Sequence, residues 1–105
     1  VYASIDGQQM VNLNLQIKGK KKSVKSDINM PFYQTAELEK KIDNRDYYFE
    51  VNPKKGTNPN DVDIEVRLLY KNGSKIIAKK EIQAKLNKES VVSMKGVTIK
   101  VTPEI

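Results

Sequence analysis

Cysteine, histidine and tryptophan are all absent from the 105 residues of this chain. The chain therefore has no disulfide, no thiolate nucleophile, no Cys/His zinc site and no imidazole for acid–base catalysis. It also lacks a glycine-rich phosphate loop and a G-x-S-x-G nucleophile motif. We therefore predict that the protein is not an enzyme and has no catalytic residues, no cofactor and no metal site.

Long apolar runs are also missing, since no stretch approaches the roughly 18 apolar residues that would indicate a membrane-spanning helix. Hydrophobic residues make up 38% of the chain and the mean hydropathy is −0.61, which is polar without the extreme bias of a disordered chain. A chain of 105 residues buries one modest core. We expect a single domain over residues 1–105.

Acidic residues are outnumbered, because 19 Lys and Arg face 13 Asp and Glu, for a net charge of +6 and a pI near 9.5. Such a surface attracts anions, whether nucleic acid, acidic lipid, acidic glycan or an acidic protein. Only Arg45 and Arg67 are arginines, and arginine is the cation that bidentate phosphate and base contacts favour. A lysine-rich surface is also an ordinary solubility trait, so the charge alone does not select a partner.

What the sequence does contain is strict alternation of apolar and polar residues. V11-N-L-N-L-Q-I17 places its apolar residues on one face of a strand, and V62-D-I-E-V-R-L68 repeats the pattern. This period of two is typical of half-buried strands in antiparallel sheets. The three-and-four spacing of an amphipathic helix is absent from both stretches.

The two halves of the chain align with one another. V11-N-L-N-L-Q-I17 matches V62-D-I-E-V-R-L68, K25-S-D-I28 matches K79-K-E-I82, and F49-E-V-N-P53 matches I99-K-V-T-P103. The offset changes only where turn-forming residues cluster, as an internal repeat requires. We predict an all-β fold of two four-stranded antiparallel repeats, about 9–53 and 61–103, joined by a linker at 54–60. Each repeat would form one sheet, and the two would pack as a β-sandwich or flattened barrel.

The predicted strands cover residues 9–18, 23–32, 35–42, 46–53, 61–71, 75–84, 89–95 and 97–103, and a proline ends the fourth strand of each repeat. Asn-Gly within 71–74 predicts a hairpin turn, and Lys95-Gly96 a tight break between the last two strands. Asp6-Gly7 would close a further hairpin if residues 1–5 form an edge strand. Residues 35–45 are ambiguous: the alignment favours a strand over 35–39 and leaves a helical turn near 39–44 open.

Seven residues are candidates for binding. The densest basic run supplies four of them, and the others are aromatic or lie in a predicted turn: Lys18, Lys20, Lys21, Lys22, Tyr33, Arg45 and Tyr48. Basic residues interleaved with aromatics suit a phosphate backbone with stacked bases. The alternative is a solvated hairpin tip protected from edge pairing by lysine. Alternation predicts that Tyr47 and Phe49 face the core, as does Phe32, and that Tyr48 faces outward.

Asp61, Asp63 and Glu65 share the outer face of one predicted strand. Three carboxylates spaced in this way would suit a hard cation if a second ligand-bearing segment met them. Neither a glycine turn nor a second ligand set accompanies them, so we expect them to pair with lysines of the neighbouring strand.

The residues Val1-Tyr2-Ala3 before Ser4 fit the small or aliphatic positions that precede a signal-peptidase cleavage site. In addition, I76-I-A-K-K-E-I-Q-A-K-L86 followed by V97-T-I-K-V-T-P-E-I105 resembles a segment in the β-modules of bacterial cell-envelope assemblies of the secretin type. The resemblance covers about 30 residues of strand pattern, and no functional residue is transferred. It implies an extracytoplasmic scaffold or accessory module.

These observations predict a non-catalytic, exported module of a bacterial cell-envelope assembly, periplasmic in location. It would bind another protein, an acidic surface or an envelope component through a sheet edge or the loops at one end. The alternative is a cytoplasmic, basic β-barrel that binds single-stranded nucleic acid through the lysines and tyrosines named above.

Overall fold

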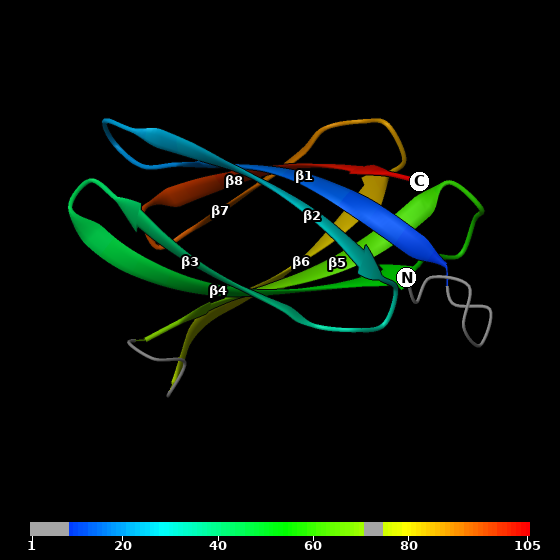
Figure 1. Cartoon of the computed structure of the whole chain (residues 1–105), viewed down its shortest axis with the longest axis horizontal. Coiled ribbons are helices and arrows are strands. Elements are labelled where there is room, and N and C mark those ends of the chain that lie inside the picture. The colour runs from blue at the N-terminus through cyan, green and yellow to red at the C-terminus, as the bar shows by residue number, and fades with distance from the viewer. Residues whose placement is uncertain (1–8, 71–74) are drawn as a thin grey trace.

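The computed structural model describes residues 9–70 and 75–105 and shows an all-β fold (Figure 1). Two four-stranded antiparallel sheets pack together as a sandwich and do not close into a barrel. The strands are β1 (Met10–Lys18), β2 (Ser23–Pro31), β3 (Ala36–Ile42), β4 (Arg45–Lys55), β5 (Asp61–Leu69), β6 (Ile76–Lys85), β7 (Ser90–Met94) and β8 (Val97–Glu104). The predicted fold class is therefore confirmed.

The core lies between the sheets and follows the alternation of the sequence. Each central strand buries every second residue, as the burial of Leu13 and Leu15 on β1 and of Ile64 and Val66 on β5 shows. Among the described residues no polar or charged residue is buried. Phe32 and Phe49 are buried and Tyr47 packs against the core, as predicted. Hydrophobic burial between the two inner faces therefore holds the sandwich together.

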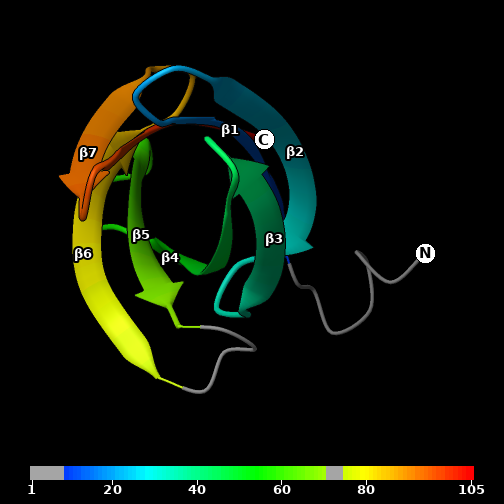
Figure 2. The ribbon, with the colours of Figure 1, turned by 90° about the vertical axis from the view of Figure 1, so that its left-hand side faces the viewer.

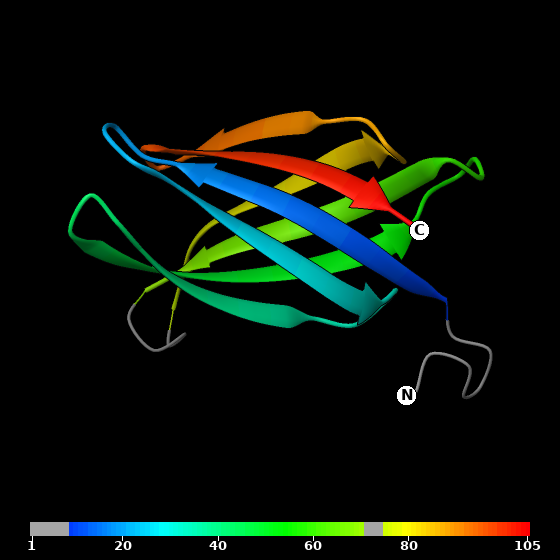
Figure 3. The same ribbon diagram turned by 45° about the horizontal axis from the view of Figure 1, so that its top comes forward.

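The composition of the sheets differs from the prediction that each half forms its own sheet. One sheet has the order β2-β1-β8-β7 (sheet A) and the other β3-β4-β5-β6 (sheet B), so each takes one hairpin from each half (Figure 3). The sequence pattern fixed the faces of the strands but carried no information on which hairpins become neighbours. Both arrangements bury the same residues, so alternation alone cannot separate them.

The pairings of one sheet nevertheless recur in the other at the offsets of the sequence alignment. In sheet A, Leu15 lies opposite Val101, and in sheet B the aligned Val66 lies opposite Val51. At the outer pairs, Leu13 faces Ile28 and Ile64 faces Ile82, while Leu38 faces Phe49 and Val92 faces Ile99. The two sheets are thus related by an approximate two-fold symmetry, in which each strand of one half takes the place of the aligned strand of the other half.

The two prolines do not end their strands, contrary to the prediction. β4 continues past Pro53 to Lys55, and β8 continues past Pro103 to Glu104, so Lys54 and Lys55 belong to a strand and not to the linker. The pairing of β3 with β4 begins at Val51, so the missing N–H of Pro53 faces a side where no strand is paired. A proline costs no ladder hydrogen bond at such a position.

Each proline carbonyl instead accepts a hydrogen bond from a residue in the left-handed region. The Tyr33 amide donates to the Pro53 oxygen at 2.7 Å, with a φ of 66° at Tyr33. The aligned Asn87 amide donates to the Pro103 oxygen at 2.7 Å, with a φ of 62° at Asn87. The connections β2–β3 and β6–β7 therefore share one construction.

The β3–β4 and β7–β8 connections are both two-residue hairpin turns with two positive φ values. Asp43 and Asn44 have φ of 52° and 65°, and Lys95 and Gly96 have 45° and 86°, which is the pattern of a type I′ turn. Residues 36–42 form a strand, so the strand prediction for 35–39 is confirmed and the helical alternative for 39–44 is wrong. The predicted turns at Asp6-Gly7 and at 71–74, and the predicted edge strand at 1–5, lie outside the described residues.

The hairpin turns converge on one end of the sandwich, on the left of Figure 1 and facing the viewer in Figure 2. We call this the hairpin end. It comprises the β1–β2 loop (18–23), the β3–β4 turn (42–46), the β7–β8 turn (94–97), the end of β5 (69–70) and the start of β6 (75–77). The β2–β3, β4–β5 and β6–β7 connections and the C-terminus lie at the opposite end.

The aligned core pairs predict equal contributions from the two sheets. Val51 and Val101 occupy equivalent central positions and are both buried. Val51→Ala and Val101→Ala should each lower the free energy of unfolding by about 2 to 3 kcal/mol in urea denaturation, through lost burial and a small cavity. The outward-facing Thr102→Ala is the control and should change it by less than about 0.5 kcal/mol. A large loss at only one of the two valines would contradict the equivalence.

Candidate binding surfaces

The β1–β2 loop and the β3–β4 turn are held together at the hairpin end by one carboxylate. Asp43 accepts backbone N–H bonds from Lys20 at 2.6 Å, Lys21 at 3.2 Å and Lys22 at 3.1 Å. Successive amides that converge on one anion form a nest, and here the chain supplies the anion itself. Gly19 is required beside it, because a Cβ at that position would collide with the Asp43 carboxylate and the Ile42 side chain.

While Asp43 holds the backbone of the β1–β2 loop, the lysine side chains of that loop are exposed to solvent. The side chains of Lys18, Lys20, Lys21 and Lys22 are exposed around the nest, and Arg45 is exposed on the adjoining turn. The structure therefore brings the predicted basic residues together at the hairpin end. Tyr33 does not join them: it is 61% exposed and lies at the opposite end, beside Pro53.

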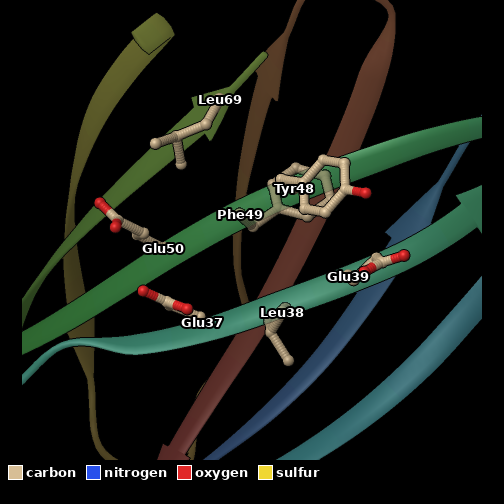
Figure 4. Close-up of a pocket in the computed structure, with 7 residues that line it drawn as sticks. All are labelled: Glu37, Leu38, Glu39, Tyr48, Phe49, Glu50 and Leu69. Atoms are coloured by element: carbon tan, nitrogen blue, oxygen red, sulfur yellow. The ribbon is translucent and has the colours of Figure 1, made fainter. Parts of the chain in front are cut away.

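Tyr48 faces outward from β4, as predicted, and lies in a depression on the outer face of sheet B (Figure 4). The depression has a volume of about 380 Å³. We call it the tyrosine depression and define it by its lining residues, which come from β3, β4 and β5: Glu37, Leu38, Glu39, Tyr48, Phe49, Glu50 and Leu69. Two aromatic residues and two leucines thus line the depression together with three glutamates.

The electrostatics of Tyr48 are those of an acidic surface. Partial burial raises the pKa of the Tyr48 phenol, and the Glu39 and Asp46 carboxylates raise it further, the former also through a hydrogen bond with the phenol. Glu39 lies directly opposite Tyr48 in the pairing of β3 with β4. A polyanion at this ring would approach several carboxylates, so the surroundings of Tyr48 favour a cationic or apolar ligand.

Arg67 orders the carboxylates beside the depression. Its guanidinium forms ion pairs with Glu65 and, at 3.4 Å, with Glu50, which is one of the lining residues. Lys79 lies 3.8 Å from the second Glu65 oxygen. Glu50 and Glu65 are each partly buried by these contacts, while Glu37 and Glu39 remain exposed at the edge of the sheet.

Two carboxylates of the run from Asp61 to Glu65 are engaged by cations of β6 and of β5 itself. Asp61 accepts a hydrogen bond from the Lys85 ammonium at 2.8 Å, which is the main reason that the pKa of its carboxyl is lowered. Glu65 is paired with Arg67 and Lys79. Within residues 9–70 and 75–105, no three carboxylates are grouped so that they could hold a metal ion.

A second groove, of about 640 Å³, runs along the hairpin end and was not predicted from the sequence. Tyr47, Tyr70 and Ile77 supply apolar surface, and the charges come from Arg45, Lys95 and the acidic Asp46. The groove shares Tyr48 and Leu69 with the tyrosine depression. Tyr70 is 54% exposed and Ile77 41%. In the sequence, alternation breaks at Leu68-Leu69-Tyr70, where the pairing of β5 with β6 shifts register. This break does not by itself predict a groove on the surface.

Comparison of the chain with protein-family models, curated protein sequences and solved structures gave no match. In the part of the chain that the structure describes, no helix has the length and apolar character needed to cross a bilayer. The geometry described above is therefore the basis for any functional assignment.

The Asp43 nest predicts a measurable contribution to stability. Asp43→Asn retains a side chain that tolerates positive φ but removes the charge that strengthens three backbone hydrogen bonds. We expect the free energy of unfolding to fall by about 1 to 2 kcal/mol in urea denaturation. Asp46→Asn is the matched control, since the same charge is lost three residues away outside the nest. Equal losses for the two variants would contradict the role assigned to Asp43.

The carboxylates near Tyr48 raise the pKa of its phenol, so neutralising one of them should change that pKa. NMR can follow the titration through the Tyr48 ring carbon bonded to the hydroxyl. Glu39→Gln removes both a charge and a charged hydrogen-bond acceptor, so the pKa of Tyr48 should move down towards its ordinary value. Glu81→Gln, a carboxylate change on β6 away from Tyr48, should leave the titration of Tyr48 unchanged. An unaltered pKa in Glu39→Gln would show that Glu39 does not act on the phenol.

Proposed function

We propose that this protein is a non-catalytic, exported scaffold module of a bacterial cell-envelope assembly, and that it binds another protein at the tyrosine depression. The observation that carries the proposal is the depression itself, where the outward-facing Tyr48 lies beside the largely buried Leu69 and three glutamates on an otherwise polar sheet face. A central aromatic with a charged rim is the usual composition of a small protein interface.

The neighbouring edge strand supports the same reading. β3 is the end strand of sheet B and has β4 as its one partner within that sheet. An extended segment that paired along β3 would place its side chains beside Glu37 and Glu39, which are exposed on that strand. The chemistry of the depression favours a partner segment with Lys or Arg side chains next to an apolar one.

Export and envelope location rest on the strand resemblance to secretin-type β-modules. A cysteine-free β-sandwich is compatible with an oxidising compartment, where no thiol can mispair. A scaffold role needs no catalytic group, in keeping with a chain that lacks histidine and cysteine.

The alternative function, binding of single-stranded nucleic acid, is favoured by the lysines and Arg45 at the hairpin end. It requires aromatic rings next to those cations for base stacking. Tyr33 lies at the opposite end of the sandwich, and Tyr48 is surrounded by Glu37, Glu39 and Glu50. Charge repulsion at Tyr48 makes this the weaker of the two proposals.

Site-specific photocrosslinking tests the protein interface. A photoreactive phenylalanine analogue at position 48, in the full chain expressed in its native host, should form one discrete adduct with a cell-envelope protein. Thr98 is the matched control, because it aligns with Tyr48 in the other half and lies on β8 in sheet A. The same analogue at position 98 should form no such adduct.

Two further variants make the result specific. Adding Glu37→Lys to the position 48 probe should remove the adduct by reversing a charge at the rim of the depression, while adding Thr102→Ala should not. The proposal fails if position 48 gives no adduct, or if positions 48 and 98 give the same set of adducts.

A further inference from the structure

Positive charge is concentrated at the hairpin end. Lys18, Lys20, Lys21, Lys22, Arg45 and Lys95 are all exposed there. Of the acidic residues on the described part of these loops, Asp43 is engaged by three backbone amides, and Asp46 is exposed. At the opposite end the charges are mixed, since Lys54, Lys55, Lys85 and Lys88 lie among Asp61, Glu89 and Glu104. In the described part of the chain, positive charge therefore exceeds negative charge by more at the hairpin end than at the opposite end.

Exposed apolar side chains occur at this same end. Tyr70, Ile76 and Ile77 flank the β5–β6 connection and are 54%, 49% and 41% exposed. Tyr70 and Ile77 line the groove that Arg45 and Lys95 border. Large apolar side chains within a basic surface cannot be explained by solubility, because they add contact with water that folding would otherwise remove.

We propose that the hairpin end docks on the surface of an anionic lipid bilayer. The lysines and Arg45 would lie against the headgroups, and Tyr70, Ile76 and Ile77 would enter the interfacial region. Cations supply long-range attraction to acidic lipid, at about 1 kcal/mol per Lys or Arg near the surface. Apolar residues among them add burial at the headgroup boundary, to a depth of roughly 5–10 Å.

The combination of features favours a bilayer over other anionic partners. Single-stranded nucleic acid uses cations and stacked aromatics but gives no role to exposed isoleucines. A second copy of this chain carries the same net charge of +6 and is repelled at low salt. A bilayer is the one of these partners that uses both the charge and the apolar side chains.

The tyrosine depression lies next to the hairpin end. Tyr48 lies three residues along β4 from Arg45, or about 10 Å at ~3.3 Å per residue. Tyr48 and Leu69 line both the depression and the groove at the hairpin end. Protein binding at Tyr48 and lipid binding at the hairpin end therefore use adjoining surfaces, and each is tested by its own assay.

Vesicle sedimentation tests the inference with the purified full chain. Vesicles of phosphatidylglycerol and phosphatidylcholine should bind the protein at about 100 mM salt, and vesicles of phosphatidylcholine alone should not. Lys20→Glu/Lys22→Glu should weaken binding by at least about 30-fold, because it removes two favourable charges. Lys54→Glu/Lys88→Glu is the matched control, with the same change in net charge outside the hairpin end, and should weaken binding no more than about threefold, the residual long-range effect.

Ile77→Ser separates interfacial insertion from attraction by charge alone. It should weaken binding several-fold and reduce the part of the binding that persists at high salt. The inference is overturned by equal binding to both kinds of vesicle, by equal losses in the two double variants, or by an Ile77→Ser variant that binds as the wild type does. It is also overturned if a single-stranded oligonucleotide displaces the protein from the vesicles by occupying the hairpin end. None of these outcomes affects the crosslink at position 48, which is assayed against protein.

Discussion

The central pairings β1·β8 and β4·β5 are the constraint on which the rest of the structure depends. Each joins one strand from the first half of the chain to one from the second, so neither half can complete a sheet alone. The core is complete only when both of these pairings have formed, because the inner face of each sheet is covered by the other. Such pairings close long loops, and the loop entropy must be offset by burial of the shared apolar faces.

The residues of the two halves resemble one another more closely at inward-facing positions than at outward-facing positions. Inward positions keep their character between the halves, as Leu15 and Val66 or Val51 and Val101 do. Outward positions do not: Glu50 aligns with Lys100, and Glu37 with Val91. Packing restricts the inner residues to apolar side chains of suitable volume, whereas the outer residues meet only solvent or a partner. Sheet B therefore carries Glu50 and Glu37 where the aligned residues of sheet A are Lys100 and Val91.

Much of the fold was predictable because it depends on local patterns. Alternation identified the strands and their inner faces, and the repeat alignment identified which strands were equivalent. The distribution of the four hairpins between the two sheets was not predictable. The alternation within a strand is the same whichever strand pairs with it. The continuation of β4 past Pro53 was missed because it depends on where β3 begins, which is a property of the sheet and not of the segment.

The surfaces were less predictable than the core, for a physical reason. Lys18 to Lys22 and Arg45 could be singled out by composition, but their meeting at the hairpin end depends on the Asp43 nest between two separate hairpins. Tyr33 was a candidate binding residue on the same grounds as Tyr48, yet it lies at the end of the sandwich opposite the hairpin end. The acidic surroundings of Tyr48 come from β3 and β4 together, at positions that only the register Glu39–Tyr48 brings face to face.

Two chemically opposite surfaces on one sandwich are compatible with the connecting role proposed above. The hairpin end is basic with exposed apolar residues, and the side of sheet B is acidic around Tyr48. Both are built on paired strands and short turns, whose geometry changes little on binding. The two surfaces adjoin, since Tyr48 and Leu69 line both the depression and the groove at the hairpin end. The distance and angle between two bound partners would then be set by the sandwich itself, which is what a scaffold must provide.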